Sequence, residues 1–256
     1  MARETNKLAK GARWRRWGGI ATLGVVSVSA AWAGMKVRAF LASSPQFALS
    51  REKPGAIMIE GLRYAPRGKV MRVFAPDFQR SVFSVPLAER RRRLLAIDWV
   101  DDASVSRLWP DRLIVRIRER QPVAFVLPGS GLLLLIDGDG VLLDPPAQAD
   151  FSFPVLSGIR EDSTEAERRE RVRAFLAFEK DLGPDAKSIS EVDAADPEDL
   201  RVVAQMGDRA VSLHMGDGNY AGRYRNFLKH YTEMAQAVPN ATSFDLRLDD
   251  RITAKE

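Results

Sequence analysis

The chain has 256 residues and a net charge of +5, but the charges are unevenly distributed. Residues 1–38 contain eight basic residues and one acidic residue, a net charge of +7, so the remaining residues together carry −2. This distribution argues against a nucleic-acid-binding domain, which needs its basic residues on one folded face. The absence of cysteine excludes a disulfide scaffold, a thiol nucleophile and cysteine-ligated metal sites.

An uncharged stretch follows the basic N-terminus. Residues 18–35 would span about 27 Å as a helix, close to the roughly 30 Å of a bilayer core, and apolar residues up to position 41 extend the stretch. Because basic residues remain in the cytoplasm, the pattern predicts a cytoplasmic tail at 1–17, a single transmembrane anchor at 18–41 and an exported remainder. The alternative is a cleaved signal peptide, with Ala31-Trp32-Ala33 as the cleavage site.

After a short linker at 42–46, residues 47–121 are predicted to form an α+β unit. Its expected elements are a strand at 56–60, helices at 69–74 and from Pro86 to about 97, and strands at 101–106 and 113–119. The order β-α-α-β-β follows from them. The run Arg90–Arg93 is expected to be a solvated helix face rather than a phosphate site, because four successive helical residues cannot form a single stripe.

Residues 122–256 are predicted to form a largely antiparallel β domain with two helices. The expected helices cover about 165–182, begun by a capping box of Thr164 and Glu167, and about 220–237. The expected strands include one long final strand at 243–253. Asp137-Gly138-Asp139-Gly140 predicts a β-turn rather than a calcium loop, because Val141 and Gln148 occupy positions that need oxygen ligands.

The sequence contains no catalytic constellation that we can recognise. Motifs for a serine nucleophile, a zinc protease or a phosphate-binding loop are absent. The two histidines, His214 and His230, are expected to be structural. These observations predict a protein without cofactor or metal that binds other proteins and is not an enzyme.

One segment is distinctive. Residues 99–113 and 115–124 read "WV-x-x-A-x-V-x-R-x-W-P-x-x-L-x-V-x-x-x-E-R-x-P-V-A" and resemble the FtsQ/DivIB family of bacterial division proteins. The resemblance implies an uncleaved inner-membrane anchor, followed in the periplasm by a POTRA domain and a β domain. It also implies a divisome scaffold at the septum, with FtsB and FtsL as direct partners. The alternative is another exported POTRA protein, of outer-membrane assembly or secretion, acting by β-augmentation.

The resemblance also implies a partner-binding face. In the family, the last strands of the β domain and the helix before them bind FtsB. An exposed edge strand can pair with an extended segment of a partner, so we expect the strand at 243–253 to be such an edge. Leu248 stands where the family usually has Tyr. Carried over by position, the binding residues are Tyr224, Tyr231, Asp245, Leu246, Arg247, Leu248, Asp249 and Ile252.

Overall fold

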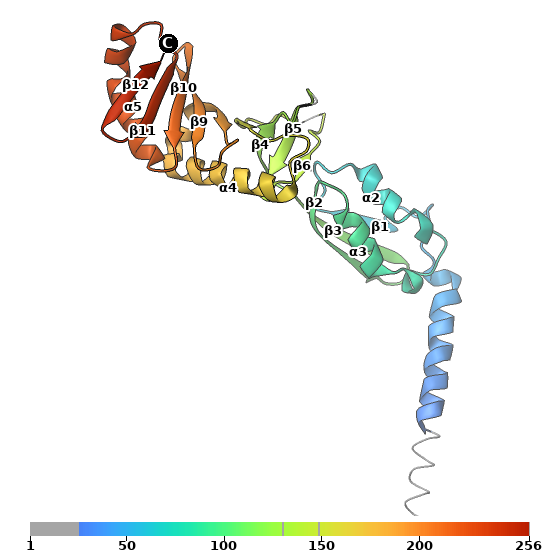
Figure 1. Ribbon diagram of the computed structural model, residues 1–256. Coiled ribbons are helices and arrows are strands. Elements are labelled where there is room, and N and C mark those ends of the chain that lie inside the picture. Colours follow the sequence, from blue (N-terminus) through green and yellow to red (C-terminus); the bar gives the residue numbers. More distant parts are fainter. Residues whose placement is uncertain (1–25, 130, 148, 256) are drawn as a thin grey trace, which may run out of the picture. The chain divides into compact units, whose positions relative to one another are not determined.

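The computed structural model describes residues 26–255 except for 130 and 148, and it has the expected α+β organisation (Figure 1). The chain forms two compact units. The first contains the chain up to Gly61 together with Arg67–Leu94 and Ala103–Ile117. The second contains Leu62–Pro66, Leu95–Asp102 and everything from Arg118 onward.

The predicted anchor lies partly outside the described residues, which begin at position 26. Residues 26–43 are helical, so the helix continues past the expected end at 41. Its large apolar side chains up to Phe40 are exposed, with exposed fractions from 57% at Phe40 to 70% at Val28. Within the part of the chain that the structure describes, no helix is both long and apolar enough to cross a membrane.

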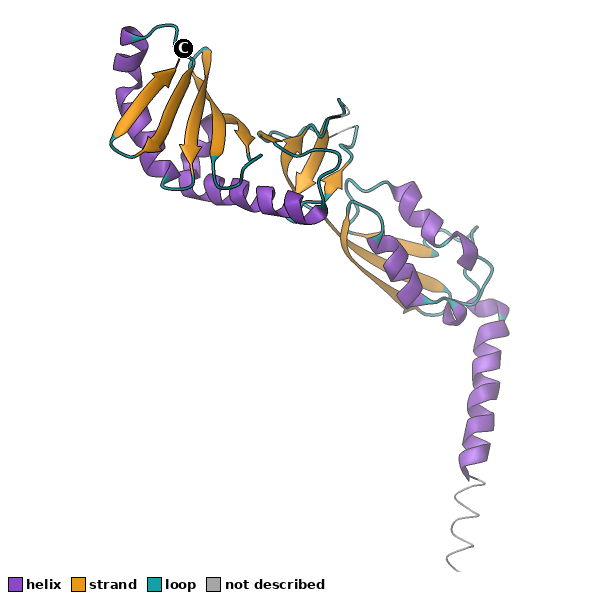
Figure 2. Cartoon of the chain, in the orientation of Figure 1, coloured by secondary structure: helices purple, strands orange, loops and turns teal. Residues whose placement is uncertain are grey.

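The first sheet has three strands in the order β1-β3-β2. They are β1 (Ile57–Glu60), β2 (Val100–Leu108) and β3 (Arg112–Glu119), and β1 pairs in parallel with β3. The expected alternation in β3 is confirmed, since Leu113, Val115 and Ile117 are all buried. The helices are α2 (Arg67–Val73) and α3 (Leu87–Leu95), so the predicted order β-α-α-β-β is confirmed (Figure 2). Short 3-10 turns lie at Pro45–Phe47, Ala75–Asp77 and Val82–Ser84.

The arginine run on α3 is not simply a solvated face, as the sequence suggested. The Arg90 side chain is only 4% exposed and donates to both carboxylate oxygens of the buried Asp77, from Nε at 2.6 Å and from Nη2 at 2.9 Å. Such a bidentate pair satisfies both charges, and it raises the pKa of Arg90. Arg91 donates to the carbonyl of Ala103, whereas Arg93 lies outward and pairs with Glu89. The sequence interpretation was therefore wrong for Arg90.

The position directly after β1, residue 61, requires a glycine. Gly61 has φ +81°, and a Cβ atom there would lie 2.0 Å from the carbonyl oxygen of Ile117. No side chain can be accommodated so close to a neighbouring strand. The backbone conformation itself is also one that favours glycine.

Beyond Gly61, the chain is held by one buried carboxylate. Glu119, 8% exposed, accepts hydrogen bonds from three consecutive backbone N–H groups, those of Arg63, Tyr64 and Ala65, at 2.7–3.0 Å. A loop without regular structure usually leaves such N–H groups to water. Here the carboxylate replaces the water and fixes the loop backbone in one place.

The same loop packs around Trp99. The Trp99 ring is 4% exposed and lies 5.4 Å from the ring of Tyr64, and its Nε1 donates to the carbonyl of Asp144 at 2.9 Å. Ala65, Leu135 and Leu143 complete this small buried cluster. These contacts explain why residues 62–66 and 95–102 belong to the second compact unit, although they precede β3 in the sequence.

The second unit contains a sheet of nine described strands in the order β12-β11-β10-β9-β8-β7-β4-β5-β6. Antiparallel neighbours predominate, as predicted, but β10–β11, β4–β7 and β7–β8 are parallel. The strands are β4 (Pro122–Val126), β5 (Leu134–Asp137), β6 (Leu142–Leu143), β7 (Val155–Ser157), β8 (Ile189–Asp193), β9 (Leu200–Met206), β10 (Arg209–Gly216), β11 (Ser243–Leu248) and β12 (Arg251–Lys255).

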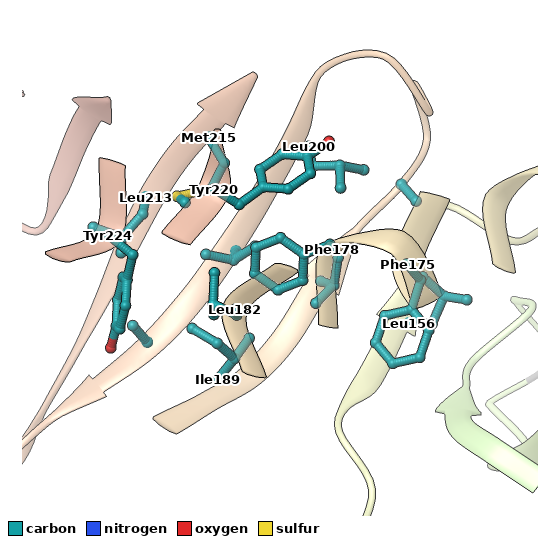
Figure 3. Packing of buried hydrophobic residues seen from close by; sticks show 14 of the residues in the cluster. Leu156, Phe175, Phe178, Leu182, Ile189, Leu200, Leu213, Met215, Tyr220 and Tyr224 are labelled. Atoms are coloured by element: carbon teal, nitrogen blue, oxygen red, sulfur yellow. The ribbon is translucent and has the colours of Figure 1, made fainter. Parts of the chain in front are cut away.

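Two helices share one core with this sheet. They are α4 (Glu165–Leu182), which leads into a 3-10 turn at Gly183–Ser188, and α5 (Tyr220–Ala237). Both lie where the sequence predicts them, and the predicted capping box at Thr164 is present. Phe175 and Phe178 of α4 pack with side chains of α5 and of the strands, and the ring of Phe178 lies 5.2 Å from that of Tyr220 (Figure 3).

Two features of this sheet differ from the expectation. The sequence pattern did not indicate β7, which has three residues but joins β4 to β8 within the sheet. The predicted final strand at 243–253 is instead two antiparallel strands, β11 and β12, which turn at Asp249 and Asp250. A run of alternating residues does not show a tight turn when the turn residues are polar like their neighbours.

The Glu119 carboxylate can be tested by its contribution to stability. We expect Glu119→Ala to lower the free energy of unfolding by about 3 kcal/mol, because one buried and two partly buried N–H groups lose their shared acceptor. Glu119→Gln keeps one acceptor oxygen and should lose less. Chemical denaturation followed by circular dichroism measures both.

Glu60→Ala is the matched control, since Glu60 forms an exposed ion pair with Arg116 at 2.8 Å. Its loss should cost less than about 1 kcal/mol. Equal losses for the Glu119 and Glu60 variants would contradict the role assigned to Glu119.

Candidate partner-binding surface

The expected binding strand is not itself an edge. β11 lies between β10, with which it pairs in parallel, and β12, with which it pairs antiparallel. The free edge at this end of the described sheet belongs to β12. Leu246 of β11 is 1% exposed, so its side chain lies in the core and not on a contact surface. The expectation that 243–248 forms an open edge is therefore wrong, and the open edge begins at Arg251.

The eight predicted residues lie on α5, on β11, on the turn after it and on β12, and only some of them are accessible. Leu248 is 58% exposed, the side chain of Arg247 49% and that of Asp249 63%. Asp245, Tyr231 and Ile252 are half-buried. Tyr224, like Leu246, is 1% exposed.

The two predicted tyrosines of α5 pack in the core of the second unit. The hydroxyl of Tyr224 lies 2.7 Å from Oγ of Ser188, and burial raises the pKa of Tyr224. Tyr231 lies about two turns further along α5, and its ring is 5.3 Å from Phe227 and 6.3 Å from Phe244 of β11. Of the two tyrosines, only the half-buried Tyr231 remains near solvent.

On the face of β11 opposite to Leu246, charged residues form a network. Arg247 donates to Asp245 from Nη2 to Oδ2 at 2.8 Å and from Nε to Oδ1 at 3.0 Å. These hydrogen bonds lower the pKa of Asp245 to about 2, against some desolvation and with a smaller contribution from the charge of His214, and the same pair raises the pKa of Arg247. The guanidinium is thereby held against the strand, with half of its side chain in solvent.

The network continues onto β10 and was not predicted from the sequence. His214 Nε2 lies 2.6 Å from Asp199 Oδ1, and His214 Nδ1 lies 4.0 Å from Asp245 Oδ2. The alternation of β10 contained the signal, because the buried neighbours Leu213 and Met215 place His214 on the opposite face. Its partners come from two other segments and could not be identified from β10 alone.

The turn between β11 and β12 is tied to the start of α5. Asp249 accepts hydrogen bonds from Arg223 Nε at 2.9 Å and from Asn219 Nδ2 at 3.1 Å, which lower the pKa of Asp249. Arg223 also donates to the carbonyl of Met215 at 2.6 Å. Gly216, with φ +74°, leaves room for this arginine, since a Cβ there would lie 3.1 Å from Arg223 Nη1. The turn is therefore held in place by side chains rather than left free.

β12 presents two different faces next to its free edge. Ile252 and Ala254 pack against the core, whereas Arg251, Thr253 and Lys255 are exposed. A strand with an unpaired edge can accept another strand through backbone hydrogen bonds. The two exposed cations favour a partner segment with acidic side chains on that face.

The described residues contain no group of three or more side chains suited to a metal ion. Asp137, in the turn that resembles a calcium loop, instead accepts from the N–H groups of Asp139 and Val141. Its other oxygen pairs with Arg120 at 2.8 Å. This carboxylate therefore stabilises its own turn.

Comparison with known proteins covers most of the chain. Residues 53–120 match the family described as POTRA domain, FtsQ-type, and residues 125–247 match the family described as Cell division protein FtsQ/DivIB, C-terminal. The second match ends at Arg247, so Leu248 and β12 lie beyond it.

Several relatives bear the name Cell division protein FtsQ. The protein of Koribacter versatilis is 36% identical over 90% of this chain and 67% of its own length. The proteins of Zymomonas mobilis and Myxococcus fulvus are 35% and 26% identical over 40% and 73% of this chain, and 33% and 65% of their own lengths. The alignments thus span about two thirds or less of these relatives. With both matched regions in the expected order, the chain belongs to the FtsQ/DivIB family of cell division proteins.

Proposed function

We propose that this protein is a non-enzymatic scaffold of bacterial cell division that recruits and links other division proteins at the septum. FtsB and FtsL are the partners that the family resemblance implies. The observation that carries the proposal is the free edge of β12, which lies beside the exposed Arg247 and Leu248 at the end of a sheet matched to a division family. The FtsQ-type description of residues 53–120 favours this role over outer-membrane assembly or secretion.

The proposal includes a single membrane anchor at 18–41, with the tail at 1–17 in the cytoplasm and the domains at 47–121 and 122–256 in the periplasm. Its support is the uncharged stretch from 18 to 35 and the concentration of basic residues before it. The exposed apolar side chains of the described helix, such as Val28 and Met35, also need a covering that water does not provide. N-terminal sequencing of the mature protein separates an anchor from a cleaved signal peptide.

The proposed recognition is β-augmentation. An extended partner segment pairs with the backbone of β12, its inward side chains meet Ile252 and Ala254, and its outward side chains meet Arg251 and Lys255. Arg247, held by Asp245 on the neighbouring strand, adds a third cation on the outer face. Backbone pairing supplies affinity, and the alternating side chains supply specificity.

The cellular role predicts where the protein gathers. A fluorescent fusion of the full chain should concentrate at mid-cell, and depletion of the protein should produce filaments, because septal proteins no longer assemble. Microscopy of dividing cells measures both. A uniform envelope signal together with normal division would exclude the proposed role.

The β12 edge can be tested with Thr253→Pro and Ala254→Pro. Successive N–H groups of a strand point to opposite edges, so one proline removes an outward N–H and the other removes one that bonds to β11. The variant that keeps the stability of the parent protein is the informative one. We expect its affinity for the FtsB-type partner to fall about tenfold or more, which corresponds to about 1.4 kcal/mol.

Isothermal titration calorimetry measures the affinity, and thermal unfolding identifies the stable variant. Gln205→Pro is the control for a proline that breaks hydrogen bonds inside the sheet. Gln205 lies in β9, between β10 and β8, so this variant should unfold the unit. An unchanged affinity in the stable edge variant would refute β-augmentation at β12.

The role of Arg247 predicts a change in the titration of Asp245. In Arg247→Gln, the pKa of Asp245 should rise from about 2 toward its ordinary 3.8, because the guanidinium hydrogen bonds are lost. A lowered pKa stabilises the folded protein fully above pH 3.8, and this contribution disappears as the pH falls through about 2. Carboxyl chemical shifts in an NMR titration report the change.

The same position tests binding. Arg247→Glu should weaken the partner about tenfold or more, while Arg247→Lys, which retains the charge, should weaken it less. Arg209→Glu is the control, because this exposed arginine bonds to the carbonyl of Pro239 at the opposite end of β10. Equal weakening by Arg209→Glu and Arg247→Glu would indicate a general charge effect instead of a specific contact.

A further inference from the structure

Four aromatic side chains form a cluster in the first unit, outside the partner-binding surface. Phe47, 3% exposed, is its centre, and its ring lies 6.2 Å from Phe40, 5.2 Å from Phe83 and 5.2 Å from Trp109. Phe40 belongs to the helix of residues 26–43, and Trp109 lies in the turn between β2 and β3. Aromatic contacts therefore run without a break from the apolar helix to the tip of this turn.

The turn is fixed rather than loose. Arg107 Nε donates to the carbonyl of Val82 at 2.7 Å, and its Nη2 donates to that of Val85 at 3.0 Å. The Ser81 hydroxyl in turn donates to the carbonyl of Leu41, the residue after Phe40, at 2.6 Å. Hydrogen bonds thus join the end of the helix, the segment around the 3-10 turn at Val82–Ser84 and the end of β2, and ring contacts extend to Trp109 in the turn that follows.

Within this fixed arrangement, Trp109 remains 65% exposed, and Leu108 beside it is 36% exposed. Contact with Phe47 alone does not require so large a side chain, since most of the indole lies in solvent. An indole prefers the boundary between apolar chains and water, where its ring is covered and its N–H stays hydrated. Exposure of the apolar indole surface of Trp109 to water is therefore unfavourable in free energy, and burial in a lipid interface would remove this penalty.

We propose that the β2–β3 turn, Leu108–Pro110, lies in the headgroup region of the membrane from which the helix of residues 26–43 emerges. This inference rests on the anchor in the proposed function. Lipid is the occupant that the geometry favours, because the exposed Trp109 is joined through the buried Phe47 to the apolar helix, where Val37 and Phe40 are 58% and 57% exposed. Lys36 and Arg38 are exposed on the same stretch of helix and suit the level of anionic headgroups. The contact would hold the first unit in one orientation on the membrane surface.

The test uses the full chain, which has no cysteine of its own. Leu108→Cys carries a bimane fluorophore, and the protein is reconstituted in vesicles of phosphatidylcholine and phosphatidylglycerol that contain a lipid with a nitroxide near its headgroup. Leu132→Cys, at a position 65% exposed in the second unit, carries the same label as the matched control. We expect the nitroxide lipid to quench the label at 108 several-fold more than the label at 132.

Trp109→Glu in the Leu108→Cys chain should abolish this difference, and Trp109→Phe should retain most of it. Thermal unfolding shows whether the glutamate variant still folds. If it does not, the quenching of the Leu108→Cys chain with its native tryptophan still decides the question. Equal quenching at 108 and 132, or none at 108, would overturn the inference.

Alkaline extraction of the same vesicles tests the membrane anchor separately from the lipid contact of the β2–β3 turn. A chain that is washed off the vesicles contradicts the anchor and the inference together, whereas a chain that remains bound without quenching at 108 contradicts the inference alone. Quenching should be independent of the protein-to-lipid ratio. If the quenching of the label at 108 changes with protein density, the turn contacts a second copy of the chain instead of lipid, and the inference is overturned.

Discussion

The buried carboxylate of Glu119 is the interaction on which the surrounding structure most depends. It ends β3, yet its hydrogen bonds go to residues 63–65, which are more than fifty positions earlier in the chain. Three backbone donors without regular structure are satisfied by one side chain, and the loop they belong to then packs against Trp99. Since β4 begins only three residues after Glu119, the same short segment closes one sheet and starts the next.

Elsewhere in each of the two units, side chains hold several irregular segments and turns. Arg90 and Asp77 form a buried pair behind α3, Arg120 and Asp137 fix the turn after β5, and Arg223 and Asp249 fix the turn after β11. Arginine suits this role because its planar group donates to several acceptors at once. The pair of Arg223 and Asp249 holds the turn that leads into β12, the edge that we propose for partner binding.

The partner-binding surface shows how far sequence reasoning reached. The periodic apolar residues of 165–182 and 220–237 predicted α4 and α5 at their observed bounds, because a helix that covers a sheet needs an apolar stripe along its length. The residues proposed for binding lie on α5, on β11, on β12 and on the turn between these two strands. Which of them face solvent was not predictable, since Tyr224 and Leu246 are buried by contacts with segments distant in sequence. The turn that separates β11 from β12 was missed for a different reason, because Asp249 and Asp250 are polar like the residues around them.

By itself, the sequence determined the α+β class, the order of most helices and strands, the membership of a division family, and the concentration of positive charge in the first 38 residues. These properties follow from composition, local periodicity and a long distinctive motif, all of which lie along the chain. Only the tertiary structure decided that β12 is the free edge, that Arg90 is buried, and that His214, Asp199 and Asp245 share one face. Each of these depends on which distant segments pack together, and packing between distant segments leaves no local pattern in the residues that take part.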